Sequence, residues 1–320
     1  MDDQLDPDIE QWLIQVTPET EPVTVEEARA ESRRINAEAL RRMPDSLTPD
    51  SSEDRTIDVG HGSLPIRILR PPGREPKKTI MYLHGGGWVV GDLETHLGHA
   101  RRLCVQSDAV VVSVAYRLAP EHRFPAAYED AFAATQWVGE HLDELGGSDT
   151  LVLVGDSAGG QLAASVAIGR RDAGLPVAAQ LLLYPVTDAA GRYEDPEINA
   201  FYMSRSSNYQ RFGLTLDTMV GFARHYIDLD DSWDWRVSPY RREDLSGVAP
   251  AVIHTSTMDV LRTEGNFYAD RLRQAGVDVI SREFPSLNHS YFGIGGVSGV
   301  ANAAAEQAAE DLEQLLRRNS

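Results

Sequence analysis

The feature that most constrains the fold is a series of short apolar segments, each separated from the next by a helical pattern. Four of the segments are almost continuously apolar, which is typical of strands buried on both faces of a parallel sheet. They are TIMYLH (79–84), AVVVSVAY (109–116), TLVLVGD (150–156) and AQLLLYPV (179–186). Four further strand candidates flank them: RTIDVG (55–60), LPIRILR (64–70), AVIHTST (251–257) and VISREF (279–284). Strands that alternate with helices predict a doubly wound α/β fold, here a mostly parallel sheet of eight strands flanked by helices.

Two regions fall outside this alternation. Residues 1–50 are amphipathic and lack runs of β-branched residues, so we expect a helical N-terminal arm in which Thr24 caps a helix. Residues 188–236 are rich in aromatic side chains and interrupt the strand–helix rhythm. Because ligands of an open α/β sheet bind beyond the carboxyl ends of its strands, we expect this insertion to cover a pocket. The core would then consist of residues 51–187 and 237–320.

The charge of the chain argues against several classes of partner. Its 30 basic and 49 acidic residues give a net charge of −19, which repels nucleic-acid phosphates and anionic lipid. We therefore expect neither nucleic-acid nor membrane binding. The acidic N-terminus lacks the pattern of a secretory signal, and no apolar run is long enough to cross a bilayer, so the sequence predicts a cytoplasmic protein. The single cysteine, Cys104, excludes an internal disulfide and a cysteine-rich zinc site.

A serine flanked by small residues follows one of the buried strands. The sequence Gly155-Asp156-Ser157-Ala158-Gly159 comes directly after TLVLV and directly before a helical pattern. A sharp turn from strand to helix strains the serine backbone and exposes its Oγ above the sheet. The alternative is a glycine-rich turn that only packs tightly or binds a phosphate. We interpret Ser157 as the nucleophile of an acyl-transfer site.

Three consecutive glycines follow the first of the buried strands, in HGGGW (84–88). Glycine reaches backbone conformations that are closed to other residues, so several amide groups can point toward one position. Such a position suits the oxyanion of a tetrahedral intermediate. We expect the amides of Gly85 and Gly86, with that of Ala158, to form an oxyanion hole. His84, at the end of a strand, is expected to brace the loop.

A serine hydroxyl needs a base, because it is a poor nucleophile near neutral pH. In a fold of this kind the base follows the serine in chain order. Of the histidines that do so, His225 lies in the insertion and His254 lies within a predicted strand. His289 lies in the loop after the last strand, at the end of the sheet where Ser157 emerges. We therefore expect His289 to be the base.

An acid must orient this imidazole and stabilise its charged form. Asp259 directly follows AVIHTSTM (251–258), at the end of the sheet where the base is expected. Asp188 is the alternative, since it too follows a strand, although it could equally cap a helix or a turn. We expect Asp259 to be the acid.

Together these motifs resemble the hormone-sensitive-lipase-like family of α/β-hydrolases, the bacterial group IV esterases. The resemblance covers nearly the whole chain and includes HGGGWVVGDLETH (84–96), YRLAPEHRFPAAYED (116–130), GDSAGG (155–160), YPVTD (184–188), RVSP (236–239) and DVLRTEG (259–265). It implies the α/β-hydrolase fold, a helical cap built from residues 1–50 and 188–236, the same triad and oxyanion residues, and neither metal nor cofactor. Many members pair through the last strand, so it also implies a homodimer joined around VISREF.

The chain departs from the family pattern at three places. Val260 stands where the family has a proline after the catalytic aspartate, and Ser290 stands where it has a glycine after the histidine. The insertion is also longer, which affects the size and shape of the substrate. We expect the acyl pocket to be lined by Tyr202 and Phe212 of the insertion and by Trp88, for which simple packing is the alternative.

The expected function is that of a serine carboxylesterase, which hydrolyses short- to medium-chain acyl esters through an acyl-enzyme intermediate. The same machinery would also serve a lactone, an amide or a formamide. A third hypothesis is a non-catalytic ligand receptor, like the plant gibberellin receptors of this family. Those receptors have lost the histidine, and its presence here argues against that function.

Overall fold

The computed structural model describes residues 4–17, 24–175, 177–206 and 213–319. Eight strands form one sheet in the order β1-β2-β4-β3-β5-β6-β7-β8. They are β1 (Ser51–Asp58), β2 (Ser63–Arg70), β3 (Lys77–Leu83), β4 (Val110–Val114), β5 (Gly147–Asp156), β6 (Ala179–Leu183), β7 (Ala251–Met258) and β8 (Val279–Asn288). The pairs β1–β2 and β2–β4 are antiparallel and the other five pairs are parallel. The mostly parallel, eight-stranded sheet expected from the sequence is thus confirmed.

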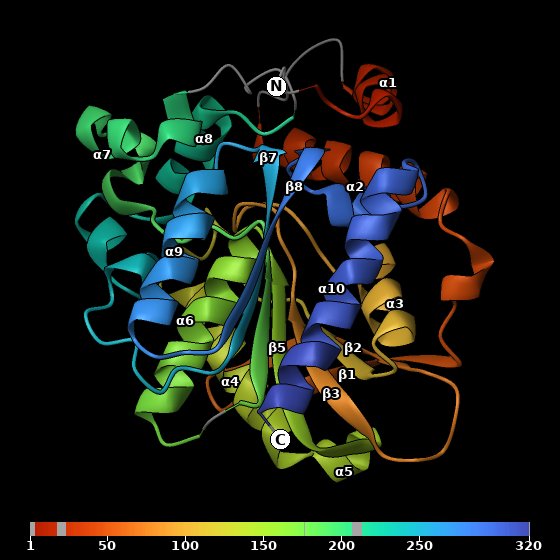
Figure 1. Cartoon of the computed structure of the whole chain (residues 1–320). Helices are drawn as coiled ribbons and strands as arrows, with labels where there is room; N and C mark the ends of the chain where they lie inside the picture. The colour runs from red at the N-terminus through yellow and green to blue at the C-terminus, as the bar shows by residue number, and fades with distance from the viewer. Residues whose placement is uncertain (1–3, 18–23, 176, 207–212, 320) are drawn as a thin grey trace.

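Helices cover both faces of this sheet. The described helices are α1 (Pro7–Val16), α2 (Val25–Arg41), α3 (Leu97–Gln106), α4 (Ala126–Glu140), α5 (Leu142–Leu145), α6 (Ala158–Asp172), α7 (Pro196–Phe201), α8 (Leu216–Tyr226), α9 (Arg262–Gln274) and α10 (Gly299–Arg318). Figure 1 shows α4, α6 and α9 on one side of the sheet and α3 and α10 on the other. Alternate strand residues therefore enter different cores: Val110 and Val112 pack toward one, Val111 toward the other. This double burial explains why β4 and β6 are apolar almost throughout.

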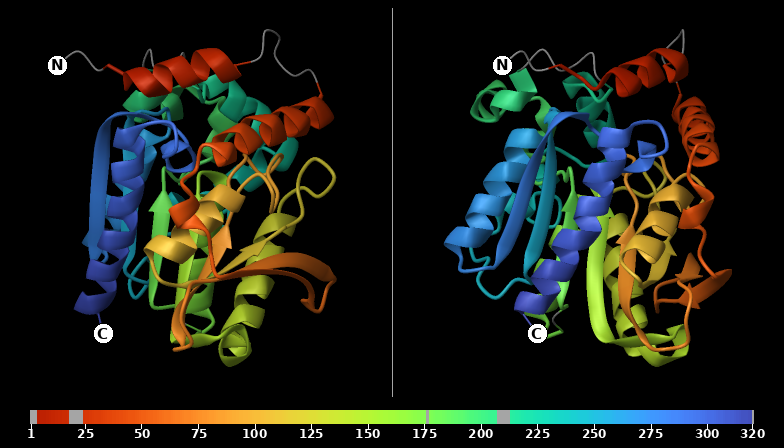
Figure 2. Two further views of the ribbon diagram at one scale, coloured as in Figure 1. Left: turned by 90° about the vertical axis from the view of Figure 1, so that its right-hand side faces the viewer. Right: turned by 45° about the vertical axis from the view of Figure 1, so that its right-hand side comes forward.

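Four helices, α1, α2, α7 and α8, gather at the end of the molecule where β7 and β8 finish (Figure 1). Figure 2 shows α1 and α2 lying across this end. The start of α2 is fixed as expected: the Thr24 side chain accepts from the Glu27 amide, and the Glu27 carboxylate accepts from the Thr24 amide. Arg29 of α2 then donates to the carbonyl oxygen of Val89 and pairs with Glu121, which ties the arm to the loops after β3 and β4.

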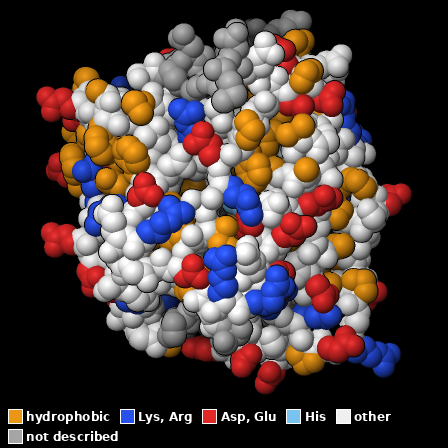
Figure 3. Space-filling model, viewed as in Figure 1, with side chains coloured by type: hydrophobic (Ala, Val, Ile, Leu, Met, Phe, Trp, Pro, Cys, Tyr) orange, Lys and Arg blue, Asp and Glu red, His pale blue; other side chains and the backbone are white. Residues whose placement is uncertain are grey.

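The insertion forms short helical turns as well as α7 and α8. Several of its large apolar side chains reach the surface: Phe201 is 53% exposed, Met203 68% and Trp233 51%. Figure 3 shows hydrophobic side chains gathered at the upper left of this face, where Figure 1 has α7, while acidic and basic groups are interspersed elsewhere. Among the described helices, none combines the length and the apolar character that crossing a membrane requires.

Candidate active site

Ser157 occupies a tight turn between β5 and α6. Its backbone is strained, with φ 55° and ψ −121°. A Cβ on Gly155 would overlap the carbonyl oxygen of Gly159, so β5 and α6 can approach this closely only because Gly155 lacks a side chain; a Cβ on Gly159 would overlap the carbonyl oxygen of Leu83 at the end of β3. The turn lifts the serine hydroxyl from the end of the sheet, as the sequence motif predicts.

Two side chains from distant parts of the chain, His289 and Asp259, lie in line with the hydroxyl of Ser157. The Nε2 atom of His289 lies 2.9 Å from the Oγ of Ser157, and the Nδ1 atom of His289 lies 2.8 Å from Oδ2 of Asp259. Asp259 follows β7 and His289 follows β8, so neighbouring strands deliver both groups to the same end of the sheet. All three side chains are more than nine-tenths buried. The structure therefore brings the three predicted residues into a continuous serine–histidine–aspartate hydrogen-bond chain.

The alternative residues have other partners. Asp188 accepts from Arg241 and from the hydroxyl of Tyr202. His254 is fully buried in β7 and contacts Asp311 of α10, with 2.9 Å between Nε2 and Oδ2. His225 is exposed on α8. None of the three bonds to the Ser157 hydroxyl among the contacts of the described residues.

The prediction for the glycine loop is partly wrong. The amide of Gly85 donates to Oδ1 of Asp156 at 2.9 Å, so it is not available to an oxyanion. Gly86 and Gly87 line the cavity beside Ser157, and within the described residues their amides and that of Ala158 have no protein partner. The sequence analysis missed Gly87, although its left-handed φ of 57° and its place as the third glycine mark it. The available donors are therefore Gly86, Gly87 and Ala158.

His84 braces the glycine loop, as expected. Its ring lies against Tyr116, with 4.3 Å between ring centroids, and its Nδ1 atom lies 2.7 Å from the carbonyl oxygen of Gly85. The Tyr116 hydroxyl donates to the carbonyl oxygen of His84 at 2.6 Å. Burial lowers the pKa of His84, so the ring is neutral. A Cβ on Gly86 would overlap the carbonyl oxygen of Val90, which shows how tightly the loop is folded.

A cavity of about 450 Å³ opens above Ser157 and His289. Three helices that lie far from the triad in the sequence, α1, α2 and α8, form part of its wall. Their lining side chains include Trp12 of α1, Ile35 of α2 and Phe222 of α8. The apolar faces of the N-terminal arm and of the insertion thus enclose the nucleophile. This arrangement suits an apolar organic group held next to a polar reacting centre.

Trp88 and Tyr202, which were expected to line the pocket, lie elsewhere. Trp88 is fully buried, donates from Nε1 to Gln161 at 2.8 Å and stacks on Tyr226. Tyr202 is fully buried as well, and its hydroxyl donates to Asp188 at 2.6 Å. Trp88 packs against α8 of the insertion, Tyr202 packs within the insertion, and neither ring lines the cavity. Phe212 lies outside the described residues.

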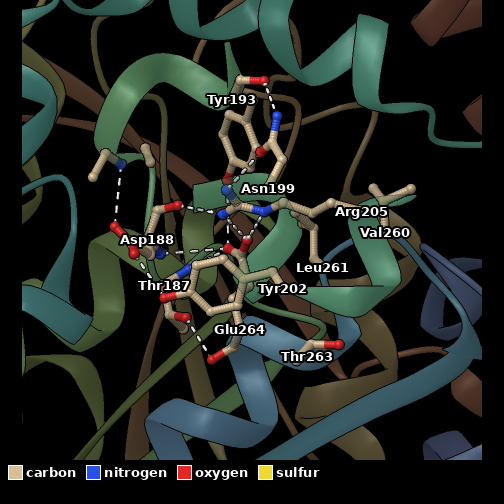
Figure 4. Close-up of polar contacts among 12 residues, drawn as sticks. Thr187, Asp188, Tyr193, Asn199, Tyr202, Arg205, Val260, Leu261, Thr263 and Glu264 are labelled. Atoms are coloured by element: carbon tan, nitrogen blue, oxygen red, sulfur yellow. Dashed lines mark hydrogen bonds and ion pairs between the residues drawn. The ribbon is translucent and has the colours of Figure 1, made fainter. Parts of the chain in front are cut away.

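A buried polar network joins the insertion to the segment that follows Asp259 (Figure 4). Arg205 and Glu264 are both fully buried and form an ion pair of 2.5 Å. Burial raises the pKa of Glu264, although the guanidinium of Arg205 opposes this. The hydroxyl of Ser204 donates to the carbonyl oxygen of Val260 at 2.8 Å. These contacts hold the loop that presents the Asp259 carboxylate to His289.

Comparisons with known proteins agree with this geometry. A family model described as the alpha/beta hydrolase fold matches residues 80–293. The chain is 38% identical to carboxylesterase NlhH of Mycobacterium tuberculosis over 326 residues, which cover 97% of this chain and 96% of that protein. It is 34% identical to an ethyl acetate hydrolase of Pseudomonas putida over 84% of both chains. A solved hyperthermophilic esterase from the archaeon Pyrobaculum calidifontis superposes with a TM-score of 0.87 at 34% identity, covering 98% of this chain and 99% of the other.

Proposed function

The chain belongs to the α/β-hydrolase family, and from this premise we propose that it is a serine carboxylesterase acting on small acyl esters. The observation that supports this most is the hydrogen-bond chain from Ser157 through His289 to Asp259. It supplies a nucleophile, a base and an acid in the order that acyl transfer requires. The names of the related carboxylesterase and ethyl acetate hydrolase point to the same class of substrate.

In the proposed reaction, the Oγ of Ser157 attacks the ester carbonyl carbon while Nε2 of His289 takes the hydroxyl proton. The carboxylate of Asp259 stabilises the imidazolium that forms. The amides of Gly86, Gly87 and Ala158 donate to the oxyanion. The tetrahedral intermediate then expels the alcohol, which receives the proton from His289 and leaves an acyl group on Ser157.

Hydrolysis of the acyl-enzyme repeats these steps with water. His289 takes a proton from the water, whose oxygen attacks the acyl carbon, and then returns the proton to Ser157 as the carboxylic acid leaves. Each oxyanion donor lowers the barrier by about 3 kcal/mol in comparable enzymes. The cavity of about 450 Å³ and its apolar walls favour short to medium acyl chains.

We also propose that residues 1–50 and 188–236 act together as a cap over the substrate. In support, α1, α2 and α8 all contribute walls to the cavity.

A homodimer through β8 is a further proposal. It is supported by the position of β8 as an edge strand of the sheet, with the three residues 281–283 exposed. Light scattering at twice the chain mass of 35.3 kDa would support it. A cytoplasmic location stays a prediction that cell fractionation would test.

The test of the function is the hydrolysis of p-nitrophenyl acetate and butyrate by the wild type and by Ser157→Ala. We expect the wild type to turn over both esters and the variant to lose at least about 10³-fold in kcat. Equal turnover by both proteins would contradict the assignment. Lactone and amide substrates measured in the same way distinguish an esterase from the other acyl hydrolases.

A further inference from the structure

Three buried side chains that the triad does not use meet in the lining of the cavity. His96 and His99 come from the start of α3, three residues apart, and Asp156 ends β5. One ring nitrogen of each histidine and one carboxylate oxygen of Asp156 lie within 4.8 Å of one another. All three side chains are more than nine-tenths buried, yet all three line the cavity that contains Ser157.

The ring of His96 presents its second nitrogen to Asp156. Its Nδ1 atom lies 2.9 Å from the hydroxyl oxygen of Thr95, and that hydroxyl lies 3.0 Å from the carbonyl oxygen of Asp92. In the tautomer that carries its proton on Nδ1, the lone pair of Nε2 faces Oδ2 of Asp156 across 3.7 Å, a distance too long for a direct hydrogen bond. A cation between these two atoms would bind both of them.

His99 presents a second unpaired nitrogen. Its Nε2 atom is buried and, within the described residues, has no hydrogen-bond partner. Its ring has three aromatic neighbours: His96, Phe292 and Tyr82 lie at 4.9, 5.6 and 6.3 Å between ring centroids. Buried polar atoms are rarely left unpaired, so this nitrogen points to a partner that the protein itself does not supply.

We propose that His96, His99 and Asp156 form a binding site for a divalent transition-metal ion of the zinc type. Two imidazole nitrogens and one carboxylate oxygen are a common set of three zinc ligands, and the fourth position would open toward the cavity. Calcium and magnesium prefer oxygen ligands alone and are disfavoured here. Tetrahedral zinc needs ligand atoms about 3.3 Å apart. The side chains must therefore close by no more than about 1.5 Å from the observed limit of 4.8 Å.

Occupation of this site inhibits ester hydrolysis, because Asp156 is shared with the glycine loop. Its Oδ1 atom accepts from the amide of Gly85 at 2.9 Å and from the hydroxyl of Tyr82 at 2.6 Å. A metal ion on Oδ2 withdraws charge from this acceptor and pulls the carboxylate toward the histidines. Gly85 directly precedes the oxyanion donors Gly86 and Gly87, so the loop is displaced from its active position. The inhibition rests on the proposed esterase function, whereas the binding of the ion does not.

The binding test uses Co²⁺ as a spectroscopic substitute for Zn²⁺, added to full-length protein that has been treated with a chelator. We expect one Co²⁺ per chain, with the intense visible absorption of a four-coordinate ion, and displacement by one equivalent of Zn²⁺. His99→Phe removes a ligand but keeps an aromatic ring next to Tyr82 and Phe292, and it should raise the Kd at least about 100-fold. His225→Gln, on the exposed face of α8, is the matched control and should bind like the wild type.

The outcomes separate this site from adventitious binding and from the esterase assignment. The proposal is overturned if the wild type binds no Co²⁺ or binds it no more tightly than His99→Phe does. It is also overturned if the bound Co²⁺ shows only the weak absorption of a six-coordinate ion held by surface carboxylates. Should circular dichroism show that His99→Phe does not fold, His99→Gln takes its place under the same criterion. Ser157→Ala must still bind Co²⁺ although its ester hydrolysis falls by at least about 10³-fold. Zn²⁺ must inhibit the wild type reversibly but not His99→Phe; equal inhibition of both would refute the inhibitory role.

Discussion

Arg205 provides the most demanding test of how the fold holds the loop that carries Asp259. Its guanidinium is fully buried, pairs with Glu264 at 2.5 Å and donates to the carbonyl oxygen of Asp188 at 2.6 Å. It also lies 4.3 Å from the centre of the Tyr202 ring. The substitution Arg205→Met keeps much of the side-chain volume and removes the charge. It therefore leaves the carboxylate of Glu264 buried without its cation.

The magnitude follows from this burial. Removing one partner of a buried ion pair costs about 3–5 kcal/mol, because the remaining charge loses its compensation and cannot reach water. Glu264 keeps a close bond from the amide of Thr187 at 2.8 Å and two long ones, at 3.4 Å, from the amide of Asp188 and the hydroxyl of Tyr193. Burial already raises the pKa of Glu264 above its ordinary value of 4.5, and the loss of Arg205 removes the largest of the interactions that oppose this rise. The folded variant thus binds a proton more tightly than its unfolded chain does, so its stability must fall as the pH rises above 4.5.

The assay is urea denaturation of the wild type, Arg205→Met and the double variant Arg205→Met/Glu264→Gln at pH 5 and pH 8. We expect the single variant to lose about 3–5 kcal/mol of unfolding free energy at pH 8 and less at pH 5. The double variant should recover most of the loss, because a neutral glutamine can still accept from Thr187. A single variant that loses less than about 1 kcal/mol at pH 8, or a double variant no more stable than the single, would refute this reasoning.

Two further predictions concern the cavity and the sheet. Phe222 packs so closely on the glycine loop that a Cβ on Gly87 would overlap its ring. Phe222→Ala should therefore raise the kcat/KM ratio of octanoyl to acetyl p-nitrophenyl esters roughly tenfold; an unchanged ratio would show that the ring does not limit chain length. Although burial opposes it, hydrogen bonds from His254 and Arg282 lower the pKa of Asp311 to about 2, from an ordinary value of 3.8. This stabilises the fold above pH 3.8 and is lost as the pH falls toward 2, so Asp311→Asn should cost about 2 kcal/mol at pH 7 and progressively less in acid. Thermal melts that show a pH-independent difference from the wild type would contradict this.

Local sequence was sufficient wherever a backbone constraint dictates residue type. The buried strands are recognisable because strands covered on both faces must be apolar almost throughout, as VVVSV in β4 is. The turn at Ser157 is recognisable because no residue larger than glycine fits at positions 155 and 159. His289 and Asp259 could be placed because the carboxyl ends of all parallel strands lie at the same end of the sheet.

Local sequence was insufficient wherever contacts between distant residues decide. Three successive glycines are equally permissive, and only the carboxylate of Asp156, 71 residues from Gly85, determines that the first amide is occupied. Trp88 and Tyr202 could be recognised as large apolar rings, but their burial depends on the remote partners Gln161 and Asp188. A large aromatic side chain near a cavity can either line that cavity or pack in the protein interior, and sequence spacing alone does not distinguish these two positions.

The measurement that tests the central claim most directly is covalent labelling by a fluorophosphonate, with the modified residue identified by mass spectrometry. Only a serine activated by a base attacks this reagent rapidly, so the reaction reports the nucleophile and the base together. The geometry predicts a single adduct on Ser157, formed rapidly in the wild type and at least about 10³-fold more slowly in His289→Gln. An adduct on another residue, or equal labelling rates in the two proteins, would contradict the account.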